Sequence, residues 1–95
     1  MNYEWDNEKA ILNLRKHSVD FLDAIAALED CNRLEQIDAR VEYGEERLQI
    51  VGMARGFILF VVATMRSEDH CRIISARKAD RDEQDWYYAG DAEAW

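Results

Sequence analysis

The spacing of apolar residues along this chain changes from helical to strand-like after about residue 30. Before that point, apolar side chains recur three and four positions apart in two short stretches, which predicts two amphipathic helices. Asp6 and Asp20 precede these stretches and can cap their first turns. The two apolar stripes, which should pack on a sheet, consist of Ala10, Ile11 and Leu14 and of Phe21, Ala24, Ile25 and Leu28.

The remaining chain is dominated by short segments of β-branched and aromatic residues. Residues 3–5 and 34–37 form short strand candidates, and the better candidates are 48–54, 57–66 and 72–77. We therefore predict an α+β fold with an antiparallel sheet of about four strands and both N-terminal helices on one face.

The C-terminal region predicts one more short helix. Asp80 and Glu83 have the spacing of a capping box, and Gly90 stands where the helix should end. Residues 91–95 should form a frayed tail. With no linker or repeat in the sequence, we expect one domain over residues 1–95.

Strand alternation predicts which side chains share a face of the sheet. We assume a two-residue turn at 55–56 and a second turn that places Arg66 opposite Cys71 and Thr64 opposite Ile73. One face is then apolar and should carry the helices, with Leu48, Ile50, Leu59, Val61, Ala63, Ile74 and Ala76. The other, mixed face should bind a ligand, with Arg47, Gln49, Thr64, Arg66, Ser75 and Arg77.

Composition restricts the class of protein. The 95 residues carry a net charge of −8, which repels nucleic acid at long range, but residues 66–81 hold five basic and three acidic side chains. Cys31 and Cys71 do not complete a zinc pattern with the two histidines, so we expect buried thiols, no metal and no cofactor. No signal peptide or long apolar span is present, which predicts a cytoplasmic protein without a membrane partner.

Three ordered segments resemble the BrnT toxins of type II toxin–antitoxin systems. The first is Tyr3-Glu4-Trp5-Asp6 with Lys9-Ala10, Asn13, Lys16-His17, Val19, Phe21 and Ala24. The second is Gly44-Glu45-Glu46-Arg47 with Gly52. The third is Val61-Val62, Thr64, Arg66 and Arg72-Ile73-Ile74-Ser75-Ala76-Arg77, followed by Ala79 and Glu83.

This resemblance implies a RelE-like fold and endoribonuclease activity on an RNA substrate. It also implies a ribbon-helix-helix antitoxin similar to BrnA as the partner, with operator DNA contacted only through that antitoxin. We expect the antitoxin to cover the mixed face around Arg47, Arg66 and Arg77.

Metal-independent RNA cleavage needs a group that moves protons and cations that stabilise the phosphorane. His17 is the first choice for proton transfer because histidine exchanges protons near neutral pH. The full set of catalytic candidates is Arg66, Arg77, His17, Lys16 and Glu46, with Glu46 as an alternative base. Arg47, Thr64 and Ser75 are the candidates for RNA binding.

Several of these residues also have structural explanations. His17 can satisfy carbonyl groups at the end of its helix, and Lys16 can be an ordinary solvated side chain. Glu46 and Arg47 can form cross-strand ion pairs. Two further functions stay open: a catalytically weak relative that acts as an antitoxin-binding co-repressor, and an unrelated small α+β binding domain.

Overall fold

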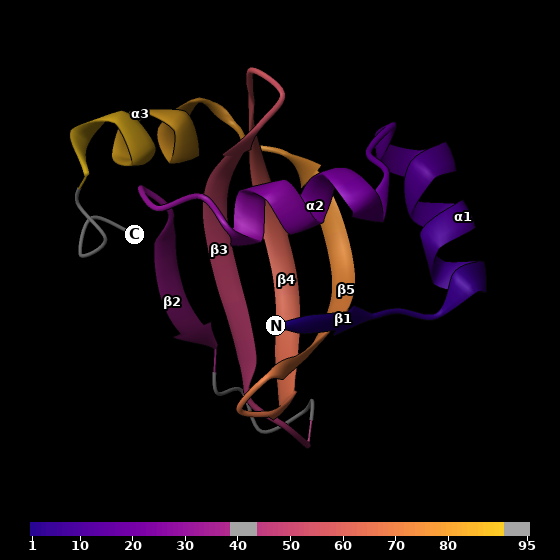
Figure 1. Cartoon of the computed structure of the whole chain (residues 1–95). Helices are drawn as coiled ribbons and strands as arrows, with labels where there is room; N and C mark the ends of the chain where they lie inside the picture. The colour runs from indigo at the N-terminus through magenta and orange to yellow at the C-terminus, as the bar shows by residue number, and fades with distance from the viewer. Residues whose placement is uncertain (39–43, 91–95) are drawn as a thin grey trace.

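The computed structural model describes residues 1–38 and 44–90, which form three helices and five strands (Figure 1). In chain order the elements are β1 (Asn2–Glu4), α1 (Asn7–His17), α2 (Phe21–Leu28), β2 (Leu34–Asp38), β3 (Arg47–Ala54), β4 (Phe57–Ser67), β5 (His70–Lys78) and α3 (Arg81–Ala89). No helix in these ranges is long and apolar enough to span a membrane. The predicted tail, 91–95, lies outside the described residues.

The sheet has five strands in the order β1-β5-β4-β3-β2, so the prediction of four antiparallel strands is wrong. The additional strand is β1, which pairs in parallel with β5 from Asn2 opposite His70 to Glu4 opposite Arg72. The other neighbouring pairs are antiparallel. The short segment 3–5 was visible in the sequence, but its partner lies nearly 70 residues away, and no local signal reports such a pairing.

The predicted helix caps are confirmed. The Asp6 carboxylate accepts the backbone N–H groups of Glu8 and Lys9 at 2.9 and 3.1 Å. Asp20 caps α2 in the same way. The capping box of Asp80 and Glu83 opens α3, and Gly90 ends it in the left-handed conformation.

The turn between β3 and β4 is the two-residue hairpin that the sequence predicts. Arg55 and Gly56 have φ values of 52° and 84°, which matches a type I′ turn, and Ala54 lies opposite Phe57. The register of this hairpin is therefore confirmed as far as Leu48 opposite Ala63.

The predicted register between β4 and β5 is confirmed from Phe60 to Val62 and is wrong by one residue from Ala63 onward. Val62 lies opposite Ser75 as predicted, but Ala63 lies opposite Ile73, so Ile74 is the extra residue of a β-bulge. As a result Ile73, at 1% exposure, occupies the core position that was predicted for Ile74. A prediction that assumes strict alternation of side chains cannot reveal a bulge, because the local sequence does not mark the extra residue.

Helix α2 covers one face of the sheet, and α1 stands beside the β5 edge (Figure 1). Phe21, Ala24 and Ala27 of α2 are buried against Ile50 and Val61. The predicted packing of the α1 stripe is wrong for Ile11 and Leu14, which are 58% and 49% exposed, whereas Ala10 of that stripe does pack against the core.

Close contact between α2 and β3 depends on Gly52. A Cβ atom at this position would lie 2.2 Å from the carbonyl oxygen of Ala27, well inside van der Waals contact. Gly52 therefore permits the helix backbone to rest directly on the strand.

Helix α3 packs on the opposite face, where Tyr87 joins Leu34, Val51 and Ile58. Asp30, which follows α2, connects the layers because its Oδ2 accepts both the Tyr87 hydroxyl at 2.5 Å and the Met53 N–H at 2.9 Å.

The two cysteines are both free, but only Cys71 is buried. Burial raises the pKa of its thiol. Cys31 is exposed in the turn after α2, so the prediction of two buried thiols is wrong for this residue.

Candidate functional site

Helix α1 is fixed to the edge of β5 by one buried polar side chain. Asn13, at 7% exposure, donates from Nδ2 to the carbonyl oxygens of Ala76 and Val19 at 2.8 and 3.0 Å. Its Oδ1 accepts the Ala76 N–H at 3.1 Å. β1 pairs with only three residues of β5, from His70 to Arg72. At Ala76, farther along β5, Asn13 makes the hydrogen bonds that a neighbouring strand would make.

A cavity of about 220 Å³ opens between α1 and β5 beside this contact. It lies at the β-bulge, which places both Ile74 and Ser75 in its wall. Bulges of this kind often redirect side chains toward a functional site. The lining residues are Lys9, Leu12, Asn13, Lys16, His17, Ile74 and Ser75.

The chemistry of this lining favours an anion. Lys9 and Lys16 carry positive charge, His17 can carry it, and no lining residue is acidic. Such a basic cavity is notable in a chain whose net charge is −8. The exposed lysines supply point charges, and Ser75 supplies a hydroxyl, which together suit a phosphate group. We refer to this feature as the α1–β5 cavity.

Three of the predicted site residues, Lys16, His17 and Ser75, come together here from opposite ends of the chain. Lys9 was not among the predicted site residues. It shares a helical face with Asn13 and Lys16, at intervals of four and three residues, so a search for polar stripes would have found it.

Arg66 lies elsewhere, at the end of β4. Its guanidinium pairs with Glu4 at 3.7 Å and with Glu45 at 3.8 Å. Glu4 also meets His70 at 3.0 Å and Arg72 at 3.9 Å, so this carboxylate links β1 to β4 and β5. These exposed ion pairs add to the backbone pairing of β1 with β5 and to the packing of Tyr3 on the core.

Glu46, Arg47 and Thr64 form a separate group at the start of β3. Glu46 and Thr64 line a cavity of about 300 Å³, and the Thr64 hydroxyl donates to the Glu46 carbonyl oxygen at 2.9 Å. Arg47 Nε lies 4.0 Å from Oε1 of Glu45. These residues share no lining with the α1–β5 cavity.

Arg77 is engaged with α3. Its two terminal nitrogens each donate to a carboxylate oxygen of Glu83 at 2.8 Å, and its Cζ lies 4.3 Å from the centre of the Phe60 ring. The hydrogen bonds to Glu83 raise the pKa of Arg77. Glu83 is 5% exposed, so this bidentate pair ties the end of β5 to the first turn of α3.

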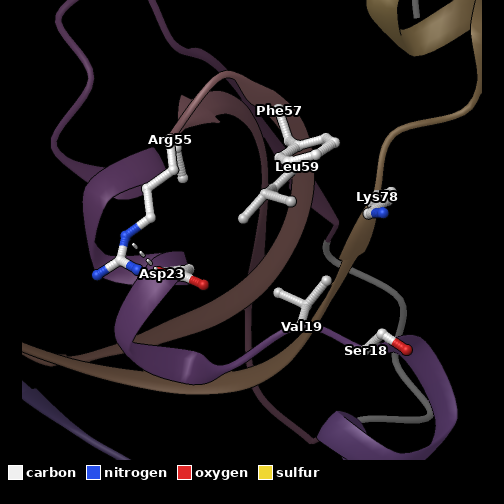
Figure 2. A pocket seen from close by; sticks show the side chains of 8 residues that line it. Ser18, Val19, Asp23, Arg55, Phe57, Leu59 and Lys78 are labelled. Carbon is white, nitrogen blue, oxygen red and sulfur yellow. Dashed lines mark ion pairs between the residues drawn. The ribbon is translucent and has the colours of Figure 1, made fainter.

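Another cavity, of about 180 Å³, lies between the start of α2 and the β3–β4 turn (Figure 2). Figure 2 shows an apolar floor that includes Val19 and Leu59, with the ion pair of Arg55 and Asp23 (3.1 Å) beside it. An acidic side chain therefore offsets the basic charge here, unlike in the α1–β5 cavity. Among the described residues, no group of three His, Cys, Asp or Glu side chains is placed to hold a metal ion.

Comparison with known proteins decides the family. The sequence model of the ribonuclease toxin BrnT, of type II toxin–antitoxin systems, matches residues 5–83. The chain belongs to the BrnT family. The resemblance seen in the sequence is thereby confirmed, and BrnT proteins are ribonuclease toxins.

The fold is also similar to a solved BrnT structure. The crystal structure of the Brucella abortus ribonuclease toxin BrnT matches with a TM-score of 0.62 and 25% sequence identity, over 85% of this chain and 99% of that one. No curated protein sequence matches the chain. The BrnT family thus accounts for the α+β architecture, and membership of a type II system implies an antitoxin partner.

Proposed function

We propose that this BrnT-family chain cleaves RNA in the α1–β5 cavity without a metal ion. The observation that carries the proposal is the gathering of Lys9, Lys16, His17 and Ser75 around one cavity without an acidic residue. An RNA phosphate is the anion that a ribonuclease must hold, and this cavity combines phosphate-binding cations with a proton-transfer group.

In the proposed reaction, neutral His17 takes the proton of the 2′-hydroxyl group. The O2′ atom then attacks phosphorus, and the bond from phosphorus to O5′ breaks, which leaves a 2′,3′-cyclic phosphate. The leaving O5′ receives a proton from the imidazolium of His17. Lys9 and Lys16 stabilise the negative charge of the phosphorane, and Ser75 positions a phosphate oxygen.

The remaining candidates take supporting roles in this proposal. Arg66 and Arg47 lie along the sheet outside the cavity, where they would contact flanking RNA. Thr64 is only 3% exposed and donates to the Glu46 carbonyl oxygen, so it would support the start of β3 instead of contacting RNA. Glu46 and Arg77 stay candidates for catalysis, but Arg77 already stabilises Glu83. RNA that reached all these residues would have to extend across the sheet.

The direct test is cleavage of naked and ribosome-bound RNA by the purified chain in EDTA. We expect cyclic-phosphate products, and loss of about 100-fold or more in rate for His17→Gln, in line with the usual contribution of acid–base catalysis. His70→Gln is the matched control, because His70 lies on the hairpin beside Glu4. Full activity of His17→Gln, or cleavage only with added metal, would contradict the mechanism.

We further propose that the partner is a dimeric ribbon-helix-helix antitoxin. A chain with a net charge of −8 is a poor ligand for DNA, so operator binding would depend on a basic surface of the antitoxin. The complex should bind operator DNA with a steep salt dependence, and the isolated chain should bind negligibly. Comparable operator binding by the isolated chain would contradict this division of roles.

A second function is favoured by the net charge of −8 and by the ion pairs that already occupy Arg66 and Arg77. In this alternative the chain is a weak nuclease that serves as an antitoxin-binding co-repressor. Growth arrest on inducing the chain alone distinguishes the two, because only the active ribonuclease should produce it.

A further inference from the structure

Four charged or ionisable side chains from three strands gather at one end of the sheet, outside the α1–β5 cavity. Glu4 of β1 lies at their centre, with Arg66 of β4 and with His70 and Arg72 of β5 around it. The four side chains are between 32% and 49% exposed, so a ligand can reach them from solvent. We refer to this feature as the Glu4 cluster.

The two arginines of the Glu4 cluster are ion-paired but not hydrogen-bonded. Arg66 lies 3.7 Å from Glu4 and 3.8 Å from Glu45. Arg72 lies 3.9 Å from Glu4, so all three distances exceed that of a hydrogen bond. Arg77, by contrast, donates two hydrogen bonds of 2.8 Å to its carboxylate partner. Within the part of the chain that the structure describes, the N–H donors of the guanidinium groups in the Glu4 cluster are therefore available to a phosphate.

A second β-bulge places Arg66 beside Glu4. The register of β4 and β5 shifts between Met65 and Ser67, which makes Arg66 an extra residue of β4. Bulges redirect side chains, and here the guanidinium group lies near a carboxylate of the edge strand. The other register shift, at Ile74, forms part of the wall of the α1–β5 cavity. Each register shift of this strand pair thus lies beside basic side chains.

The Glu4 cluster and the α1–β5 cavity lie on the same face of the sheet. Arg72 lies opposite Thr64, and Ser75, which lines the cavity, lies opposite Val62. Thr64 and Val62 are two positions apart on β4, so they and their partners point to one face. The separation along the strand is about 7 Å. An RNA strand with one phosphate in the cavity therefore reaches the Glu4 cluster with a neighbouring phosphate.

We propose that Arg66 and Arg72 form a second phosphate subsite for the RNA substrate, and that Glu4 competes with RNA for these arginines. This inference rests on the proposed function, in which the α1–β5 cavity holds the scissile phosphate. In the free chain, Glu4 orients both guanidinium groups. When RNA binds, a phosphate takes the N–H donors that Glu4 leaves unused. The carboxylate stays nearby and weakens RNA binding by charge repulsion.

A purely structural role explains less of the Glu4 cluster. Exposed ion pairs contribute little to stability, and the backbone of β1 is already paired with β5. His70 Nε2, at 3.0 Å, is the closest of the three basic groups to Glu4 and orients its carboxylate. Glu45 lies beside Arg66, so Arg72 has fewer carboxylates near it and is the sharper residue to test.

The test measures binding of the purified full chain to a fluorescent single-stranded 2′-O-methyl oligoribonucleotide, which has phosphates but no free 2′-hydroxyl group to react. Arg72→Ala should weaken binding roughly 10-fold, because charge-assisted hydrogen bonds to a phosphate are lost. The slope of log Kd against log salt concentration should become shallower by roughly 0.7, the value for one phosphate of a single strand. Glu4→Gln should instead tighten binding about 3- to 5-fold, because a competing charge is removed.

The ion pair of Arg55 and Asp23, near the other end of β4, provides matched variants. Arg55→Ala removes the same charge as Arg72→Ala, and both controls should leave RNA binding unchanged. Asp23→Asn removes the same charge as Glu4→Gln. Arg72→Lys keeps a cation beside Glu4 and should bind with intermediate affinity, because lysine lacks the planar fork of donors. Melting temperatures show whether each variant is folded.

Unchanged RNA binding by Arg72→Ala would overturn the subsite. Unchanged or weaker binding by Glu4→Gln, or equal tightening by Asp23→Asn, would overturn the competition by Glu4. Cleavage assays separate this inference from the proposed function. If His17→Gln loses cleavage but Arg72→Ala binds RNA like the wild type, only the subsite fails. If the wild type binds RNA through the subsite but does not cleave it, only the proposed cleavage fails, and if the wild type binds no RNA, both fail.

Discussion

The side-chain amide of Asn13 pairs with the backbone of Ala76 through both of its polar atoms, as an adjacent strand would do. Nδ2 donates to the carbonyl oxygen at 2.8 Å, and Oδ1 accepts the N–H at 3.1 Å. This contact fixes α1 to the sheet and holds one wall of the α1–β5 cavity against the other.

We expect Asn13→Ala to lower the free energy of unfolding by about 2–4 kcal/mol, because buried groups of Ala76 and Val19 lose their partners. Urea denaturation measures this loss. Asn32→Ala, an exposed asparagine in a turn, should change stability by less than about 0.5 kcal/mol. Equal stability of the two variants would show that Asn13 does not anchor the helix.

Charge removal tests the cavity as the site of phosphate binding. Lys9→Ala and Lys16→Ala should each lower the rate of RNA cleavage roughly 10- to 100-fold, less than for a fully enclosed site because both lysines are exposed. Lys78→Ala removes a lysine from the cavity of Figure 2 and should have little effect on rate. A similar loss in all three variants would point to general electrostatic attraction instead.

The pair of Arg77 and Glu83 should affect stability before it affects catalysis. Arg77→Ala leaves the buried Glu83 carboxylate without its bidentate partner, so the free energy of unfolding should fall by roughly 2–4 kcal/mol. This value is lower than for a fully buried pair, because the Arg77 side chain is 36% exposed. Arg77→Lys should recover part of this stability but not the second hydrogen bond. Thermal denaturation beside cleavage assays at low temperature separates the effects, and a stable but inactive Arg77→Ala would favour a catalytic role.

Gly52 should tolerate no side chain. Gly52→Ala puts a Cβ atom against the Ala27 carbonyl oxygen. We therefore expect the free energy of unfolding to fall by roughly 3 kcal/mol or more, or the variant to fail to fold. Gly90→Ala is the comparison, because its Cβ would meet no atom within 4 Å and only the left-handed backbone opposes it, at about 1 kcal/mol. Chemical denaturation ranks the two variants, and the reverse order would contradict the close helix–strand contact.

The contact of Asp30 with Tyr87 predicts how stability varies with pH. Burial acts to raise the pKa of Asp30, but hydrogen bonds from Tyr87, Asn32 and Met53 outweigh it and lower the pKa below 3.8. Burial and the bond to Asp30 raise the pKa of Tyr87 to about 12. The contribution of Asp30 to folding stability is therefore lost as the pH falls through the lowered pKa of Asp30. The contribution of Tyr87 to folding stability is lost as the pH rises from 10 to about 12.

Urea denaturation of the wild type and Asp30→Asn from pH 2 to 11 tests this dependence. The variant should be less stable near neutrality, and the difference should shrink in acid. Asp85→Asn, at an exposed position of α3, should follow the wild-type curve. A constant difference between wild type and Asp30→Asn at all pH values would contradict the assignment.

The sequence by itself determined the elements whose signals are local. Asp6, Asp20 and Asp80 mark helix starts because a short acidic side chain can bond the free amides of a first turn. The turn at Arg55 and Gly56 set the register of β3 and β4. The ordered motifs from Tyr3 to Glu83 identified the family, which no single residue would have done.

Tertiary structure alone decided features that depend on distant partners. The parallel pairing of β1 and the bulge at Ile74 arise from contacts remote in sequence, so strand alternation could not reveal them. The orientation of α1 was decided by Asn13, because satisfying the open backbone of Ala76 and Val19 outweighed burial of Ile11 and Leu14. In this orientation of α1, Lys9, Lys16 and His17 line one cavity with Ser75. Arg66 and Arg77 lie elsewhere, paired with the carboxylates of Glu4 and Glu83.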